Sequence, residues 1–199
     1  MAKDPQIKKL MIEETKKIIE ENGKVTIKDI SERCYVNIAS VNYYFGSKEN
    51  LIFIVISEVL SEIKSNIIDM VKKRQGTNAE IFLEEVIGYI YSFSVNHMGV
   101  LRYLFLADGL KEGQLSEFVR TFFTDPEFIA VAYNNLGKDF QADDSKRLQV
   151  KYMIIFSSFF MPLFFQIMNP SMNEKNQMDT FKDSEFKKYF IEQILKIIV

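Results

Sequence analysis

Apolar residues along this chain recur mainly at the three- and four-residue spacing of α-helices. Glycine and proline, which punctuate chains built of short strands, are scarce, with eight and four copies in 199 residues. The pattern therefore predicts an all-α fold of about nine helices.

The first fifty residues divide into three short predicted helices. These helices cover residues 5–21, 27–34 and 38–44. Gly23 ends the first helix, and Thr26 and Asn37 are good N-caps for the other two. A tight turn at Tyr35 joins the second helix to the third, which is the plan of a helix-turn-helix. We expect this three-helix head, a DNA-binding domain, to occupy residues 1–47.

The remaining residues, 48–199, predict a second and larger helical domain. Its helices are expected over residues 48–74, 79–97, 100–106, 115–122, 126–137, 144–168 and 184–198. Gly137 should end the helix that begins at Pro126. The polar segment 171–180 is expected to be an exposed loop.

Composition favours a cytoplasmic protein and offers no membrane segment. Cys34 is the only cysteine, which suits a reducing compartment. The most apolar stretch, residues 152–168, contains Pro162 and falls short of the roughly 20 residues needed to span a bilayer. We interpret it as a buried helix. The charged start of the chain has no apolar run behind it and is not a secretory signal.

Enzyme chemistry finds little support in this sequence. The single histidine, His97, and the single cysteine lie in different predicted domains, so they form neither a nucleophile pair nor a zinc site. No glycine-rich phosphate loop occurs. Adjacent acids such as Glu84 and Glu85 diverge by about 100° on a helix. We expect no catalytic residues, no cofactor and no metal.

The most specific segment of the chain covers residues 26–51, TIKDISERCYVNIASVNYYFGSKENL. A threonine precedes an isoleucine-containing helix, and a turn follows. A hydrophobic residue, aromatics ending in Phe45 and Ser-Lys-Glu before Leu51 then complete the motif. This motif resembles the signature of the TetR (tetracycline-repressor) family, over about the first fifty residues. The resemblance implies a helix-turn-helix regulator with a C-terminal helical ligand-binding and dimerisation domain.

The third predicted helix has the two faces that a recognition helix needs. Ile38, Ala39 and Asn42 share one face, which we expect to be exposed. Val41 and Phe45 lie on the other face, toward the core. Asn42 could pair bidentately with an adenine edge, while Ile38 and Ala39 could contact thymine methyl groups.

Other DNA contacts follow from the family resemblance. It implies phosphate contacts from Thr26, Ser40, Tyr43, Tyr44 and Lys48. We also include Asn37, the N-cap of the third helix, in the predicted DNA-binding set. Plainer roles stay open: Thr26 is a cap in any case, Tyr43 or Tyr44 could simply pack, and Lys48 could be an ordinary solvated lysine.

The charge of the head has the sign expected for a DNA-binding domain but is small, and two features of the head depart from the family pattern. Residues 1–50 hold nine basic and eight acidic residues, a small net charge of +1. Tyr35 stands where the family usually has glycine, and a non-glycine residue at positive φ costs roughly 1 kcal/mol, so the turn is either reshaped or strained. No Arg or Lys occurs between Asn37 and Tyr44, and we therefore expect an A·T-leaning operator.

Aromatic residues on separate helices of the second domain form the predicted effector site. These candidates are Tyr89, Phe93, His97, Tyr103, Phe122, Tyr133, Tyr152 and Phe156. The resemblance implies that such helices enclose a cavity, which would suit a small apolar or aromatic effector. Plain core packing stays open for any single one of these aromatics, and a structural or exposed role stays open for His97.

The family plan also implies a homodimer through the last two helices. Their large hydrophobic residues form two apolar stripes: Phe156, Phe159, Phe160, Leu163 and Phe164 on one helix, and Phe186, Phe190, Ile194 and Ile197 on the other. Two heads would then read a palindromic operator as a repressor, and the fourth helix, over residues 48–74, would transmit effector binding to DNA. The alternative is an activator or architectural protein with the same head and no small ligand.

Overall fold

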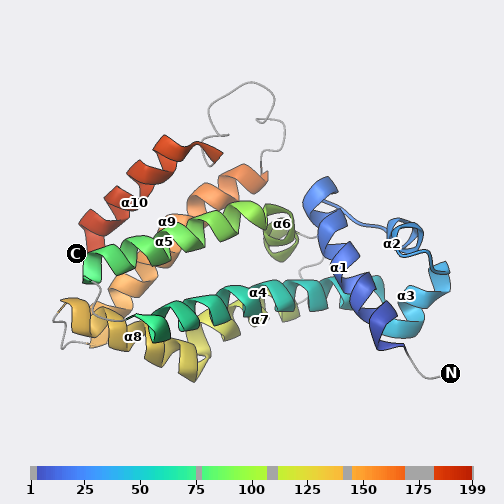
Figure 1. Ribbon diagram of the computed structural model, residues 1–199, viewed down its shortest axis with the longest axis horizontal. Coiled ribbons are helices and arrows are strands. Elements are labelled where there is room, and N and C mark those ends of the chain that lie inside the picture. Colours follow the sequence, from blue (N-terminus) through green and yellow to red (C-terminus); the bar gives the residue numbers. More distant parts are fainter. Residues whose placement is uncertain (1–3, 75–77, 107–111, 141–144, 169–181, 199) are drawn as a thin grey trace. The chain divides into compact units, whose positions relative to one another are not determined.

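The computed structural model describes residues 4–74, 78–106, 112–140, 145–168 and 182–198. Within these ranges the chain forms ten α-helices and one π-helical turn, and no strand occurs there, so the all-α prediction is confirmed (Figure 1). The elements are α1 Pro5–Asn22, α2 Ile27–Arg33, α3 Ile38–Phe45, α4 Lys48–Lys73, α5 Ala79–Asn96, α6 Met98–Leu106, α7 Glu112–Val119, η1 Arg120–Thr124, α8 Pro126–Phe140, α9 Ser145–Met168 and α10 Ser184–Ile198. The loop predicted over 171–180 lies outside the described residues.

Two predicted helix ends differ from the structure. The helix that begins at Pro126 does not end at Gly137 but continues to Phe140. A glycine inside a helix costs only about 0.5–1 kcal/mol relative to alanine, so it weakens a helix without ending it. The helix predicted over 115–122 begins earlier, at Glu112, and changes at Arg120 to a π-helical turn.

The chain divides into two compact units. The first comprises residues 1–62 and 97–118, and the second comprises residues 63–96 and 119–199. The first unit therefore contains α6 and the first part of α4 in addition to the three helices of the head. Since the boundary falls at Glu62, inside α4, one continuous helix contributes residues to both units.

Side chains from five helices build the core of the first unit, which also includes most of α7. Met11, Ile30, Val41, Ile56 and Leu104, one from each of α1, α2, α3, α4 and α6, are completely buried. Burial of a residue of this size stabilises a fold by about 1.5–3 kcal/mol, so this core fixes the three head helices against α4 and α6.

The core of the second unit lies where α10 packs against α5 and α9 (Figure 1). The ring of Phe190 on α10 lies 5.4 Å from that of Tyr91 on α5 and 5.2 Å from that of Phe159 on α9. Lys64 of α4 forms a 2.7 Å ion pair with Asp125, the residue before α8. None of the described helices has the length and apolarity needed to cross a membrane.

Candidate nucleic-acid interface

The turn between α2 and α3 is a Schellman motif with a tyrosine at its left-handed position. The N–H of Tyr35 donates to the carbonyl of Glu32 at 3.3 Å, and the N–H of Val36 donates to the carbonyl of Ser31 at 3.0 Å. Tyr35 has φ 54°, so the turn is not reshaped to avoid the positive φ. The two helices thus meet in the geometry of a glycine-type turn without a glycine.

A capping box starts α2. The N–H of Asp29 donates to Thr26 Oγ1 at 3.2 Å, and the N–H of Thr26 donates to Asp29 Oδ2 at 2.8 Å. The Thr26 hydroxyl also donates to this carboxylate at 2.8 Å, and this bond is the main reason that the pKa of Asp29 is lowered. The predicted cap is confirmed, and the exposed threonine leaves this helix N-terminus open to solvent.

Helix α3 carries the predicted buried and exposed faces. Asn37 Oδ1 accepts from the N–H of Ala39 at 2.9 Å and caps the helix. Val41 and Phe45 are buried, as predicted. On the opposite side Ile38, Ala39 and Asn42 are all exposed, so none of the residues that the structure describes covers the face that would meet base edges.

The aromatic pair on α3 shares one contact but differs in exposure. The rings of Tyr43 and Tyr44 meet edge to face with centroids 5.2 Å apart. Tyr43 is exposed, whereas Tyr44 is half-buried and its hydroxyl accepts from the N–H of Asp4 at 3.2 Å. Tyr44 therefore ties the start of α1 to α3, and Ser40, also half-buried, lies on the same helix.

The start of α4 is fixed to the end of α3. Ser47 Oγ accepts from the N–H of Asn50 at 3.1 Å, and the side-chain amide of Asn50 donates to the carbonyl of Phe45 at 2.8 Å. Lys48, in the first turn of α4, lies 3.8 Å from the carboxylate of Glu49. An exposed pair at this distance is worth little, so the ammonium can exchange it for another anion.

Residues 12–54 match the family model described as bacterial regulatory proteins, tetR family. This range includes the capping box, the turn, α3 and the start of α4. The head of this chain therefore resembles the DNA-binding segment of TetR-family transcriptional regulators. The matched range includes the predicted DNA-binding residues from Thr26 to Lys48.

Several solved structures share the fold over almost the whole chain. FadR from Bacillus subtilis, solved in complex with stearoyl-CoA, aligns with a TM-score of 0.67 and 14% identity, covering 96% of this chain and 97% of that chain. GusR from Salmonella enterica aligns with a TM-score of 0.65 and 11% identity, covering 100% and 98%. A tetR-family transcriptional regulator from Streptomyces coelicolor aligns at 0.62 and 11%, covering 99% and 90%. No protein of curated function matches the sequence.

Four of the predicted effector residues come together in the second unit. The ring of Tyr152 lies 4.9 Å from that of Phe156 and 5.7 Å from that of Tyr133, and Phe122 lies 5.6 Å from Phe156. The Tyr152 hydroxyl donates to the carbonyl of Phe122, and burial raises the pKa of this tyrosine well above its usual value. Phe123, which the sequence did not suggest, adds a ring 4.8 Å from Phe156.

Phe122 and Phe123 both lie in the π-helical turn η1. Phe122 and Phe123 are neighbours in sequence, and on an α-helix they would diverge by about 100°. Within η1 both rings lie against α9, at 5.6 and 4.8 Å from Phe156. A widened turn leaves no pattern of apolar positions by which it could be predicted.

The other four predicted effector residues lie elsewhere. Tyr89 and Phe93 of α5 contact each other at 5.8 Å, and the Tyr89 hydroxyl accepts from the Asn66 side chain at 2.8 Å. His97 and Tyr103 belong to the first compact unit. His97 Nδ1 lies 3.2 Å from Glu20, and the Tyr103 hydroxyl accepts from the N–H of Val25 at 2.8 Å.

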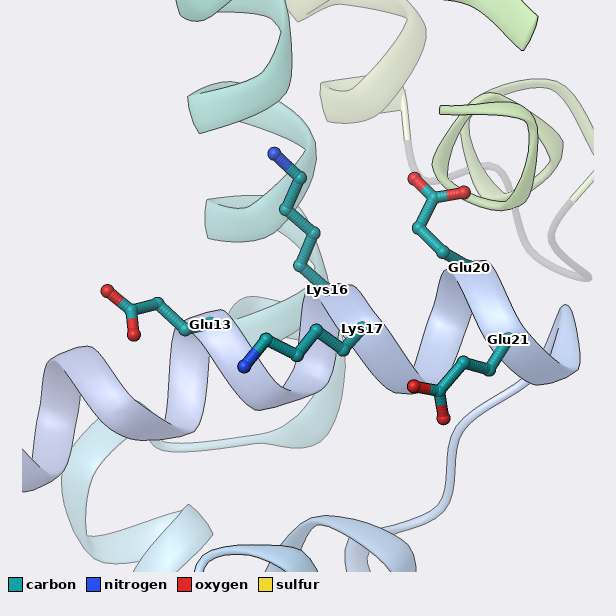
Figure 2. Close-up of a pocket in the computed structure, with 5 residues that line it drawn as sticks. All are labelled: Glu13, Lys16, Lys17, Glu20 and Glu21. Atoms are coloured by element: carbon teal, nitrogen blue, oxygen red, sulfur yellow. The ribbon is translucent and has the colours of Figure 1, made fainter. Parts of the chain in front are cut away.

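A hollow on α1 is lined by charged residues that already have partners. Its walls are Glu13, Lys16, Lys17, Glu20 and Glu21 (Figure 2). Glu20 and Glu21 leave the helix in opposite directions, and Glu20 accepts from the N–H of Gly99 on α6 while Glu21 binds Arg33 on α2. Lys16 binds Glu62 of α4 at 3.1 Å. These side chains join helices of the first unit, and the hollow is the space between their ion pairs.

Proposed function

We propose that the protein is a ligand-responsive repressor that binds a palindromic operator as a homodimer and is released by a small, largely apolar molecule. The observation that carries the proposal is the exposed face of α3, where no described part of the chain covers Ile38, Ala39 and Asn42. A recognition helix reads base edges with residues of this kind, near its N-terminus.

The chemistry of this face favours A·T base pairs. Asn42 offers the paired donor and acceptor that match an adenine edge, and Ile38 and Ala39 offer methyl groups for thymine. Helix α3 contains no Lys or Arg, the side chains that most often read guanine. We therefore expect a selected operator to be rich in A and T at the contacted positions.

Phosphate contacts are proposed at the starts of α2 and α4. A helix N-terminus presents free N–H groups and the positive end of the helix dipole, which favours an anion. Exposed Thr26 lies at the start of α2, and Lys48 adds a cation in the first turn of α4. Tyr43, exposed beside the base-reading face, is proposed as a third backbone contact.

The proposed dimer uses the exposed sides of α9 and α10. Several of the hydrophobic residues predicted for the dimer interface pack within the chain, since Phe159, Leu163 and Ile194 are buried. A second set remains exposed: Val150, Met153 and Met161 on α9, with Tyr189 and Ile197 on α10. Spacings of three and eight residues place the α9 members on one helix face. A second copy of the chain would cover such a face, and two-fold symmetry suits a palindrome.

The effector is proposed to act at the aromatic cluster of Phe122, Phe123, Tyr133, Tyr152 and Phe156. The rings of this cluster are apolar and come from three elements, so a ligand entering between them would move η1 or α8 against α9. Stearoyl-CoA, seen in the complex of Bacillus subtilis FadR, carries a long acyl chain, and that example supports an apolar effector class here. Helix α4 begins in the head and ends in the second unit, which makes it the proposed route from effector to DNA.

The test of this function is fluorescence anisotropy on a palindrome selected from random DNA, at two salt concentrations. Asn42→Ala should lose preference for the selected site over scrambled DNA by about 1–3 kcal/mol. Lys48→Ala should weaken both DNAs alike and reduce the salt slope by about one. Lys73→Ala, at the far end of α4, is the matched control and should bind as the wild type does. A wild-type protein that selects no site from random DNA would contradict the function.

A further inference from the structure

Tyr35 combines the most unfavourable backbone and the most exposed aromatic side chain of the head. It is the only non-glycine residue with positive φ among the residues that the structure describes. Its side chain is 96% exposed, against 56% for Ile38 and 48% for Tyr43. The Schellman position that it occupies is usually glycine, because a Cβ at positive φ is strained.

The fold of the chain gives no reason for a tyrosine here. A ring that is 96% exposed gains almost no hydrophobic stabilisation, so burial does not offset the backbone strain. The turn's hydrogen bonds, from the N–H groups of Tyr35 and Val36, involve main-chain atoms only and would form equally with glycine. Strained residues of this kind persist mainly at functional sites.

The position of Tyr35, close to the start of α3, indicates that this function is contact with DNA. Asn37, the N-cap of α3, follows two residues later, and so the two Cα atoms are at most about 7 Å apart. In a helix-turn-helix the first helix crosses the DNA backbone and the start of the second enters the major groove. The turn between them therefore lies where the wall of the groove, sugar and phosphate, would be.

We propose that Tyr35 is a DNA-contacting residue, with its ring against a deoxyribose and its hydroxyl donating to a phosphate oxygen. This proposal rests on the proposed DNA-binding function and adds a contact at a position where a glycine can make none. A tyrosine hydroxyl is an ordinary donor to phosphate in protein–DNA complexes. The contact also supplements a recognition helix that has no cation of its own.

The test separates binding from stability, because the two should change in opposite directions. Tyr35→Gly removes the strain and should raise the melting temperature by about 2–4 °C. The same variant should lose about tenfold or more in affinity for the selected palindrome and for scrambled DNA alike, since a backbone contact is not sequence-specific. Tyr35→Phe should keep the wild-type stability and lose less affinity than Tyr35→Gly, because the ring remains.

Each other result has a definite meaning. Asparagine also tolerates positive φ, so Tyr35→Asn is a second variant that lacks the aromatic ring. It should bind DNA as weakly as Tyr35→Gly. If both variants bind the palindrome as tightly as the wild type, the contact is wrong while the DNA-binding function stands. A loss confined to the palindrome would overturn the backbone contact in favour of a base contact. If the wild type binds no selected site, the function and the contact fail together.

Discussion

Glu20 of α1 accepts a hydrogen bond from the backbone N–H of Gly99 in α6, with Oε2 2.8 Å from the nitrogen. The carboxylate thus satisfies a free donor in the first turn of α6, where the helix dipole favours negative charge. Its other oxygen lies 3.2 Å from His97 Nδ1. One side chain therefore fixes the start of α6 to the end of α1, within the unit that contains the proposed DNA-binding residues.

Gly99 is required by this close approach, and its replacement should destabilise the protein. A Cβ at this position would lie 2.5 Å from the carbonyl oxygen of Ile19 and 2.8 Å from the Cα of Glu20, both backbone atoms that cannot move alone. We expect Gly99→Ala to lower the free energy of unfolding by about 1–3 kcal/mol, measured by urea denaturation.

Gly88 provides the matched control for this substitution. It lies inside α5, and a Cβ there would meet only Ile191 Cδ1 at 3.6 Å, an ordinary contact. Gly88→Ala should therefore stabilise the protein by about 0.5–1 kcal/mol, through helix propensity. Equal effects at the two glycines would show that α6 does not approach α1 as closely as the structure indicates.

The contacts of α6 show where sequence patterns stop being informative. Apolar spacing predicted a helix near residues 100–106, but spacing does not identify the helix on which it packs. Glu20 and Gly99 are 79 residues apart, and neither belongs to a recognisable motif. For the same reason the sequence did not indicate that His97 contacts Glu20 or that Tyr103 contacts Val25.

Local features of the head could be predicted because their causes are local. Thr26 and Asn37 cap helices through hydrogen bonds to residues two or three positions away. The buried face of α3 follows from the four-residue spacing of Val41 and Phe45. The strain at Tyr35 was one of two outcomes that the sequence predicted, because a non-glycine residue in a helix-ending turn must take either positive φ or another turn. The π-helical turn at Phe122 has no such local cause.

Acid should weaken the ion pairs that Arg33 makes across the first unit. Arg33 lies 2.7 Å from Glu21 and 2.8 Å from Glu14. Hydrogen bonding to Arg33 lowers the pKa of Glu21, and hydrogen bonding first to Lys17 and then to Arg33 lowers that of Glu14. A carboxylate with a lowered pKa stabilises the fold above its unfolded pKa of about 4.3, and this stabilisation is lost as pH falls through the folded value.

Arg33→Gln should therefore be less stable than the wild type at pH 7, with a difference that shrinks between pH 5 and pH 3. Urea denaturation at several pH values measures the difference. Lys28→Gln is the control, because the Lys28–Glu32 pair spans 3.7 Å with both side chains largely exposed and should contribute little. If the difference in the free energy of unfolding between the wild type and Arg33→Gln stays constant with pH, packing of the arginine, not its charge, is responsible.

The hydroxyl of Tyr152 should contribute to stability through the carbonyl of Phe122. Both residues are buried, so removing the hydroxyl leaves the carbonyl without this donor in a site that excludes water. We expect Tyr152→Phe to lower the free energy of unfolding by about 0.5–1.5 kcal/mol, measured by urea denaturation. Tyr35→Phe removes the same atom from an almost fully exposed ring and should change stability by far less. A loss of equal size in both variants would assign the effect to something other than this hydrogen bond.

The exposed face of α9 should decide whether the protein is a dimer. Met153 is 56% exposed in the single chain, and the proposed interface would bury it against a second copy. Met153→Glu would then place an unpaired carboxylate between two apolar surfaces, which costs several times more than a surface substitution. We expect this variant to sediment as a monomer at concentrations where the wild type is a dimer.

The matched control for Met153→Glu is Ile81→Glu on α5. Ile81 is 53% exposed, almost the same as Met153, but it lies outside the proposed interface. Ile81→Glu should remain dimeric and bind the palindrome normally, whereas Met153→Glu should bind it weakly and bind an isolated half-site as the wild type does. These results together distinguish loss of the dimer from damage to the head, because a damaged head would weaken binding to the palindrome and to the half-site alike. If Met153→Glu is as dimeric as Ile81→Glu, this face of α9 is not the interface.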